Sequence, residues 1–183
     1  MNNQHKYKTY IPEVPTSAIE IYQMLPEGTR CEVIFNELIM SPSPSREHQF
    51  LLGDLFASLY SLFKERQTGK VFVAPFDVYF DSNQSVVQPD IFVVLKDNLE
   101  IVQKNGVHGV PDVVIEIISS NHGYDTKRKR ALYEAAGVKE YFMIDPENKK
   151  VTLLKLDQSG GYEQAYESVG KLTSAIIDCD LSF

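Results

Sequence analysis

The sequence predicts a protein of the α/β class, of the mixed α+β kind. Its central mixed β-sheet is expected to be flanked by helices. Three observations lead to this prediction. Apolar residues recur with helical spacing over residues 46–67, and runs rich in Val, Ile and Phe follow that segment directly. Helical and extended segments then alternate along the chain, which is typical of layered folds. At 183 residues we expect a single domain, 1–183, with residues 1–15 as an N-terminal arm.

The N-terminal part predicts a short helix followed by a hairpin. Thr16 or Ser17 is a suitable N-cap for a helix that ends near Leu25. Two short extended runs over Cys31–Met40, separated by Phe35-Asn36, are typical of a β-hairpin.

The helix predicted over residues 46–67 is the clearest element of the chain. The Ser- and Pro-rich segment 41–45 precedes it and supplies its cap. One stripe of the helix carries His48, Leu51, Leu52, Leu55, Leu59, Leu62 and Phe63. Such a stripe must be buried, and the strands that follow provide the surface.

The remaining elements complete the sheet and add a second helix. Strands are expected at Val71–Phe80, Val86–Leu95 and Val113–Ser119. A helix then runs from Asp125 to Ala136 and ends at Gly137 in the C′ position. The last strands are expected at Glu140–Ile144 and Val151–Leu156, paired as a hairpin, and at Tyr162–Ser168 on the edge.

Composition restricts the class of protein. No apolar run approaches eighteen residues and the N-terminus lacks an apolar signal core, so we expect a cytoplasmic protein without a membrane segment. Cys31 and Cys179 are expected to be reduced thiols, and two cysteines cannot form a cysteine metal cluster. The net charge of -7 argues against tight nonspecific DNA binding, although carboxylates that hold Mg²⁺ are themselves negative.

Three acidic side chains stand in or beside the predicted buried strands. Asp90 lies in VVQPDIFVV, and Asp112 and Glu116 lie in GVPDVVIEIIS. A carboxylate inside a buried strand costs free energy unless it is paired or binds a metal. Asp112 and Glu116 are about 13 Å apart along one strand, whereas Asp90 and Glu116 come from strands that can be neighbours about 4.8 Å apart. Asp90 and Glu116 can therefore hold one ion together. The alternative is that both charges reach solvent near strand ends or pair with Lys or Arg, and Asp112 is interpreted as a strand-start residue.

The basic run Lys127–Arg130 opens the second predicted helix. A charge run at a helix start is usually a solvated face. Lys129 differs from its neighbours because it shares the apolar stripe with Leu132, Tyr133 and Ala136, and Asp125 can pair with it one turn earlier. We therefore expect Lys129 to point inward.

The pieces Pro89-Asp90, PDVVIEIIS, Asp125 with Lys129 and Tyr133, and AGVKEYFMIDP follow one another between Pro89 and Pro146. In this order they resemble the Uma-type family of putative restriction-endonuclease-like proteins, a branch of the PD-(D/E)xK nuclease superfamily. The upstream segment RCEVIFNELIMSPSPSREHQ resembles that family's N-terminal hairpin and helix start, so the resemblance spans residues 15–156.

The resemblance implies a restriction-endonuclease-like fold with a metal-dependent site. Asp90 and Glu116 would be the carboxylate ligands, the carbonyl of Ile117 a further ligand, and Mg²⁺ or Mn²⁺ the metal. The superfamily lysine is expected two residues after Glu116, but that position is Ile118. The resemblance implies that Lys129 replaces it from the helix. The implied reaction is metal-assisted hydrolysis of a DNA phosphodiester, with Lys129 orienting or helping to deprotonate the water and stabilising charge on the phosphate.

Further candidates are less specific. Glu32 and Glu37 lie in the predicted hairpin, and either could be the acidic residue that superfamily members often add from an N-terminal element, or a solvated charge. His48 faces the sheet and is either a core histidine or a site residue, and Lys127 remains a candidate within the basic run. Tyr133 and Tyr141 are interpreted as packing residues.

Two other functions stay open. The fold could serve as a catalytically silent binding or assembly module, which the acidic charge and Ile118 favour, or as a nuclease for RNA or for a branched or modified substrate. Because 183 residues leave no room for a separate recognition domain, recognition would come from a partner, a homodimer or surface loops such as 96–110.

Overall fold

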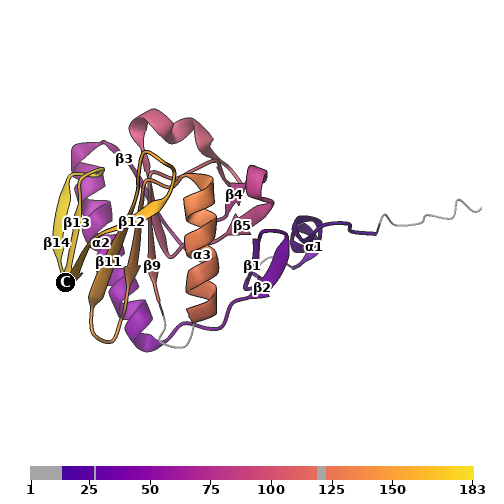
Figure 1. The fold of residues 1–183 in the computed structure, drawn as a ribbon, viewed down its shortest axis with the longest axis horizontal. Helices are drawn as coiled ribbons and strands as arrows, with labels where there is room; N and C mark the ends of the chain where they lie inside the picture. The colour runs from indigo at the N-terminus through magenta and orange to yellow at the C-terminus, as the bar shows by residue number, and fades with distance from the viewer. Residues whose placement is uncertain (1–13, 27, 119–122) are drawn as a thin grey trace, which may run out of the picture.

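The computed structural model describes residues 14–26, 28–118 and 123–183, with only the backbone for 123–125. Most of the described chain forms two mixed sheets and two long helices (Figure 1). The predicted arm falls almost entirely, and Ser119 wholly, outside the described residues.

The N-terminal helix and hairpin agree with the sequence prediction. Helix α1 (Ala18–Met24) begins after Ser17, whose side chain accepts a hydrogen bond from the Glu20 amide. Strands β1 (Cys31–Ile34) and β2 (Glu37–Met40) pair antiparallel. Phe35 and Asn36 have φ values of 51° and 61°, the left-handed conformations of a two-residue type I′ turn.

The long helix α2 (Arg46–Arg66) also forms where it was predicted. Ser45 caps it through the amide of His48, and Gln67 ends it in a left-handed conformation. Its buried stripe consists of Leu51, Leu55, Leu59 and Phe63.

The N-terminal sheet, as we call the one containing the hairpin, has the strand order β2-β1-β5-β4-β8-β7. Its further strands are β4 (Val78–Phe80), β5 (Ser85–Val87), β7 (Val102–Gln103) and β8 (Gly106–His108). Two 3-10 helices, Asp81–Asn83 and Lys96–Ile101, lie between these strands in the sequence. The segment 96–110, expected to be a loop, therefore contains a helical turn and two short strands.

The central sheet has the order β12-β11-β10-β9-β6-β3. It comprises β3 (Gly69–Val73), β6 (Ile91–Leu95), β9 (Val113–Ile117), β10 (Glu140–Ile144), β11 (Lys150–Leu156) and β12 (Tyr162–Val169). Strand β10 runs parallel to β9 and antiparallel to β11, and β12 lies on the edge as predicted. A C-terminal hairpin of β13 (Lys171–Ser174) and β14 (Cys179–Ser182) follows.

Two strand predictions are wrong in extent. The runs expected at Val71–Phe80 and Val86–Leu95 each divide into two strands that belong to different sheets: β3 and β4, and β5 and β6. Pro75 and Pro89 stand at the two breaks, where a residue without an N–H cannot continue a ladder. The chain therefore builds two sheets where the sequence predicted one.

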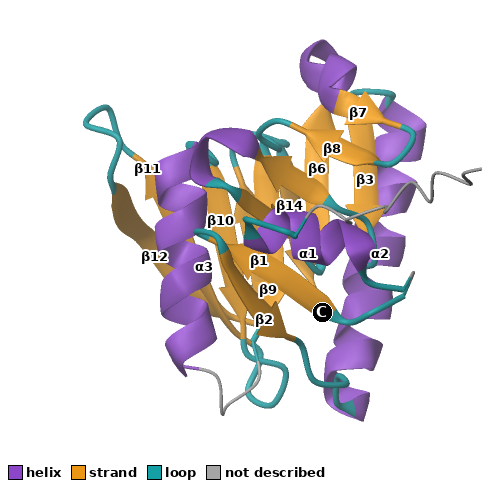
Figure 2. Ribbon diagram, turned by 90° about the vertical axis from the view of Figure 1, so that its right-hand side faces the viewer, coloured by secondary structure: helices purple, strands orange, loops and turns teal. Residues whose placement is uncertain are grey.

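Apolar clusters cover both faces of the central sheet. The two long helices lie on opposite sides of it (Figure 2). Helix α2 packs on one face, and α3 (Gly123–Ala136) packs on the other together with the N-terminal sheet. Helix α3 begins two residues before the predicted start at Asp125, and Gly137 follows it with a φ of 87°, as predicted. In the described segments no helix is long and apolar enough to cross a membrane, and Cys31 and Cys179 are buried free thiols.

Candidate active site

Asp90 and Glu116 lie opposite each other on neighbouring strands. Strands β6 and β9 pair antiparallel with Ile91 opposite Ile115. The same register, continued by one residue, sets Asp90 opposite Glu116, where Cβ atoms are about 4.5–5.5 Å apart. Because side chains alternate along a strand, both carboxylates lie on the sheet face that carries Val114 and Phe92, the face that α3 covers.

The Asp90 carboxylate is held from two directions. Its Oδ2 atom accepts a hydrogen bond from the Ile117 amide at 2.8 Å, and Nε2 of His48 lies 3.1 Å from the same oxygen. His48 comes from the first turn of α2. Burial lowers the pKa of His48, but the hydrogen bond and the charge of Asp90 outweigh it and raise that pKa above its ordinary value. Asp90 is thereby fixed in orientation.

Lys129 and Tyr133 contact Glu116 from α3. One helical turn separates them, so both reach the same face of the helix. Nζ of Lys129 lies 3.0 Å from Oε1 of Glu116, and the Tyr133 hydroxyl donates to the same oxygen at 2.6 Å. Nζ of Lys129 also lies 3.1 Å from Oε1 of Glu32, and that oxygen accepts a hydrogen bond from the Gln88 amide at 2.8 Å. The lysine thus bridges two carboxylates from two different sheets.

Negatively charged groups outnumber positively charged ones in the cluster of Asp90, Glu116, Glu32 and Lys129. Burial raises the pKa of Glu116 to about 7, helped by the charges of Asp90 and Glu32 and opposed by Lys129. Burial by itself would lower the pKa of Lys129, but the surrounding carboxylates hold that pKa well above its usual range. Lys129 is therefore a permanent cation. Three carboxylates share it, and further positive charge would stabilise the cluster.

Each of the two opposed carboxylates has one oxygen available to bind a metal. Within the described chain, Oδ1 of Asp90 and Oε2 of Glu116 accept no hydrogen bond. The described residues contain no group of three or more His, Cys, Asp or Glu side chains that could hold a metal. Mg²⁺ is typically bound through one or two carboxylates, with water and substrate phosphate completing its shell. The donor set of Asp90 and Glu116 fits that requirement.

The other sequence candidates separate clearly. Glu32 and His48 join the cluster. Ile117, whose carbonyl was expected to be a further metal ligand, lines a cleft together with Asp90, Glu116 and Lys129. Glu37 instead pairs with Arg128 and is exposed, and Lys127 is exposed. The predicted pair between Asp125 and Lys129 falls outside the described side chains.

Asp112 is occupied elsewhere in the fold. Its carboxylate binds the Leu95 amide, the Asn98 side chain and Lys139, the last at 2.7 Å. It therefore acts at the other end of β9, as the distance along the strand indicated.

Two contacts of the cluster were not expected from the sequence. Tyr133 is fully buried, as a packing residue would be, yet its hydroxyl binds Glu116; the spacing of four residues from Lys129 was the available signal. The Tyr141 side chain lines the cleft, and its buried hydroxyl has no hydrogen-bond partner among the residues that the structure describes. No feature of the sequence distinguishes that hydroxyl from an ordinary core tyrosine.

The fold is that of a restriction-endonuclease-like protein. The chain belongs to the Uma2 family, described as putative restriction endonuclease, whose model matches residues 18–175. A similar solved structure is that of a putative nuclease belonging to DUF820 from Anabaena variabilis ATCC 29413. The two chains are 18% identical with a TM-score of 0.73, and the match covers 92% of this chain and 95% of that chain. No curated protein matches the sequence.

Proposed function

We propose that the protein is an endonuclease that hydrolyses phosphodiester bonds of DNA with Mg²⁺ or Mn²⁺. Asp90, Glu116 and the carbonyl of Ile117 would hold the cation, and Lys129 would take the role of the superfamily lysine. The observation that carries the proposal is the position of the Lys129 ammonium group, 3.0 Å from Oε1 of Glu116 although the lysine comes from a helix. When bound, the cation would supply positive charge that polarises the scissile phosphate.

Lys129 is suited to orient and stabilise rather than to remove a proton. Its pKa is well above the ordinary value, so it stays protonated at neutral pH. An ammonium group has three N–H donors, and one of them is directed to Oε1 of Glu116, while Glu32 forms an ion pair with the same ammonium group at 3.1 Å. A remaining donor would serve a phosphate oxygen or the attacking water. Charge that develops on the phosphate in the transition state would be stabilised by this fixed cation.

The supporting residues act by holding these groups in place. His48 and the Ile117 amide fix Asp90, and Tyr133 fixes Glu116. Glu32 holds the lysine from the opposite side. Preorganised donors of this kind cost no reorganisation when the reaction occurs.

The proposal is tested by incubating supercoiled plasmid and single-stranded DNA with the purified protein in Mg²⁺, Mn²⁺ or EDTA. We expect cleavage that requires the metal and is lost in Glu116→Gln. Cleavage of equal rate in Glu116→Gln would refute the site. No cleavage of either DNA, combined with no Mn²⁺ binding in calorimetry, would favour a catalytically silent module.

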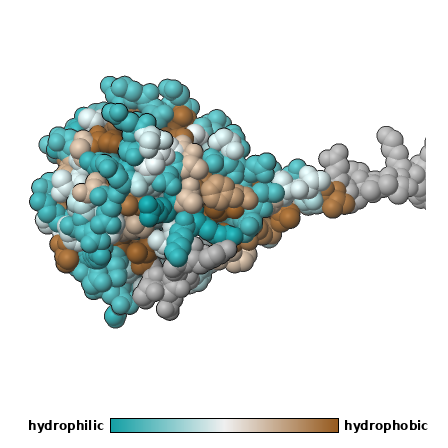
Figure 3. All heavy atoms as spheres, in the orientation of Figure 1, coloured by the Kyte–Doolittle hydropathy of each residue, from teal (hydrophilic) through white to brown (hydrophobic). Residues whose placement is uncertain are grey.

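We further propose a homodimer through the end of the molecule formed by α1 and β2. Hydrophobic side chains are exposed over that end (Figure 3), including Met24 at 70% and Met40 at 64%. In the part of the chain that the structure describes, strand β2 is also the edge of its sheet, and no described strand pairs with its outer side. Light scattering after size exclusion should give a dimer mass for the native chain and a monomer mass for Met24→Glu/Met40→Glu; a native monomer would refute the homodimer.

A further inference from the structure

The cleft beside the carboxylates is larger than the proposed reaction needs. It has a volume of about 1080 Å³ and extends from Glu116 and Lys129 past α1, the β1–β2 hairpin and the turn between β7 and β8. Pockets that enclose a drug-sized ligand measure about 300–1,000 Å³. One phosphate and one cation would leave most of this cleft unused, so it can take a longer segment of substrate.

A continuous chain of hydrogen bonds forms one side of this cleft. Glu32, which holds Lys129, accepts from the Gln88 amide at 2.8 Å. The Gln88 side chain donates to Oδ1 of Asp77 at 2.8 Å, and the hydroxyls of Tyr22 and Tyr79 donate to the same carboxylate at 2.8 Å and 2.9 Å. These polar groups satisfy one another, and three donors shield the charge of the Asp77 carboxylate.

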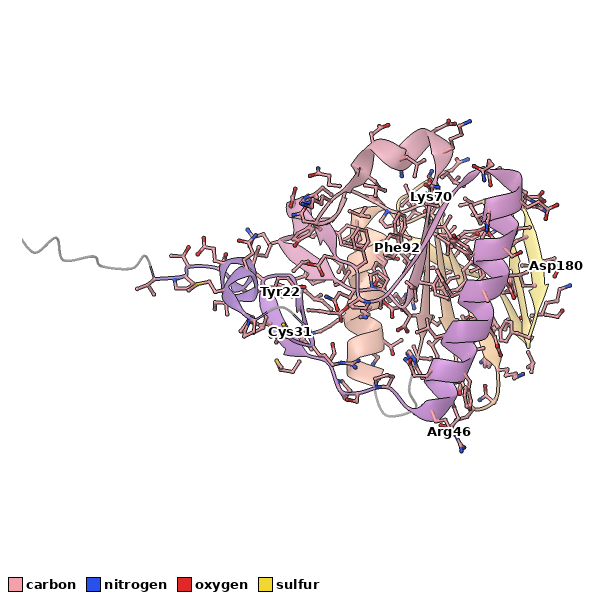
Figure 4. The ribbon with its side chains drawn as sticks, turned by 180° about the vertical axis from the view of Figure 1, so that it is seen from behind. Tyr22, Cys31, Arg46, Lys70, Phe92 and Asp180 are labelled. Carbon is pink, nitrogen blue, oxygen red and sulfur yellow. The ribbon has the colours of Figure 1, made fainter. Side chains whose placement is uncertain are left out.

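Aromatic rings lie along the same wall. Tyr22, Phe76 and Tyr79 line the cleft, and each is only partly buried. Tyr79 is stacked on His108 with ring centroids 4.5 Å apart, and Phe76 is stacked on Phe72 at 5.3 Å. Figure 4 shows Tyr22 on the N-terminal side of the molecule, apart from Phe92 in the body. Supported rings of this kind are the platforms on which unpaired bases stack.

Arg30 and Lys104 supply positive charge at the cleft. Both line it and both are exposed. Neither side chain makes an ion pair or a hydrogen bond with any residue that the structure describes, unlike Lys139, which is committed to Asp112. Their charges are therefore available to a ligand, and phosphate groups are the matching anions.

The depth of the site favours one strand over two. The side chains of Glu116 and Asp90 are only 6% and 16% exposed, at the inner end of the cleft. A phosphate on a rigid duplex would have to reach them between the walls, whereas a flexible single strand can enter. The net charge of -7 also opposes the broad phosphate contact on which duplex binding depends.

We propose that the cleft binds a single-stranded DNA segment, with Arg30 and Lys104 on its phosphates and Tyr22, Phe76 and Tyr79 against its bases. This inference rests on the proposed function. The substrate of the nuclease is then unpaired DNA, either a free strand or the flap of a branched molecule.

Binding is tested with a fluorescein-labelled 20-nucleotide strand and the matching duplex, in Ca²⁺, by anisotropy at several KCl concentrations. We expect the strand to bind at least tenfold more tightly. For single strands, each phosphate contact adds about 0.7 to the slope of log affinity against log salt, so Arg30→Ala/Lys104→Ala should reduce that slope by about 1.4. Lys64→Ala/Lys70→Ala removes equal charge away from the cleft and should leave the slope unchanged. Equal binding of duplex and strand, or an unchanged slope in the first variant, would overturn the proposal.

A small diester separates this inference from the proposed chemistry. Hydrolysis of bis(4-nitrophenyl) phosphate with Mn²⁺ requires the carboxylates and Lys129 but no strand. We expect the ratio of strand cleavage to diester hydrolysis to fall about tenfold in Arg30→Ala/Lys104→Ala, through KM, as expected for lost binding contacts made equally in ground and transition states. A protein that hydrolyses the diester but cuts duplex as fast as strand refutes the strand preference alone. A protein that binds the strand but hydrolyses neither refutes the nuclease function alone.

Discussion

The Nζ atom of Lys129 lies 3.0 Å from Oε1 of Glu116, although Lys129 belongs to helix α3 and Glu116 to β9, a strand in the middle of the central sheet. The position two residues after Glu116 is Ile118, which carries no charge. The ammonium group beside Glu116 therefore comes from α3 and not from the strand.

Replacing Lys129 by Met should lower DNA cleavage about 100- to 1000-fold, the effect of removing one preorganised charge donor. It should also destabilise the fold by about 3–5 kcal/mol, because the carboxylates of Glu116 and Glu32 would be left buried without a cation. Initial rates and urea unfolding measure the two effects. Arg130→Ala, an exposed charge on the same helix, should change neither. A Lys129→Met protein that cleaves at the native rate would contradict the role of the lysine.

Asp90→Asn and Glu116→Gln should each abolish Mn²⁺ binding in titration calorimetry and reduce cleavage by orders of magnitude, since an amide is a poor substitute for a carboxylate ligand. Circular dichroism should show that both variants are folded. Glu65→Gln, on the exposed face of α2, serves as the control and should bind Mn²⁺ normally. Normal metal affinity in either site variant would show that the cation lies elsewhere.

His48→Ala should weaken Mn²⁺ binding about 10- to 100-fold, the usual effect of losing a group that orients a metal ligand. His48→Gln can place a donor nitrogen near the position of Nε2 and should recover part of the affinity. If alanine and glutamine weaken binding equally, the histidine acts through packing and not through its contact with Asp90.

Asp112 should contribute to stability in a pH-dependent manner. Burial would raise its pKa, but Lys139, the Leu95 amide and Asn98 together lower that pKa below the ordinary 3.8. A depressed carboxyl pKa gives stability that is present above the unfolded value and is lost as the pH falls through the folded value. The free energy of unfolding should therefore decline below about pH 4, and less steeply in Asp112→Asn. Identical pH profiles for the two proteins would contradict this assignment.

The inward-facing charges could be predicted because each charged residue stands among apolar residues that are expected to be buried. Asp90 and Glu116 lie among β-branched residues, and Lys129 shares a stripe with apolar neighbours. These conflicts are local, so a single sequence reveals them. The capped helices and the Phe35-Asn36 turn were predictable for the same reason, since their signals lie within a few residues.

The choice between Glu32 and Glu37 could not be made from the sequence. Both lie in one hairpin, and which of them is buried depends on which of the two hairpin strands pairs with a third strand. Strand β1 pairs with β5 through Val33 and Val86, which places Glu32 inside, while β2 becomes the sheet edge and leaves Glu37 exposed. That pairing joins residues about fifty positions apart. The same long-range choice placed Asp77 beside Tyr22.

The two crossings of the chain, between β3 and β4 and again between β5 and β6, tie the sheets to each other. Asp90 stands at the end of the second crossing and receives its hydrogen bonds only after β9 and α2 are in place. Neither sheet can open far without pulling on the other, so the domain should lose structure in one cooperative step. Amides of β5 and β6 should accordingly exchange with deuterium through the same global opening, with equal free energies.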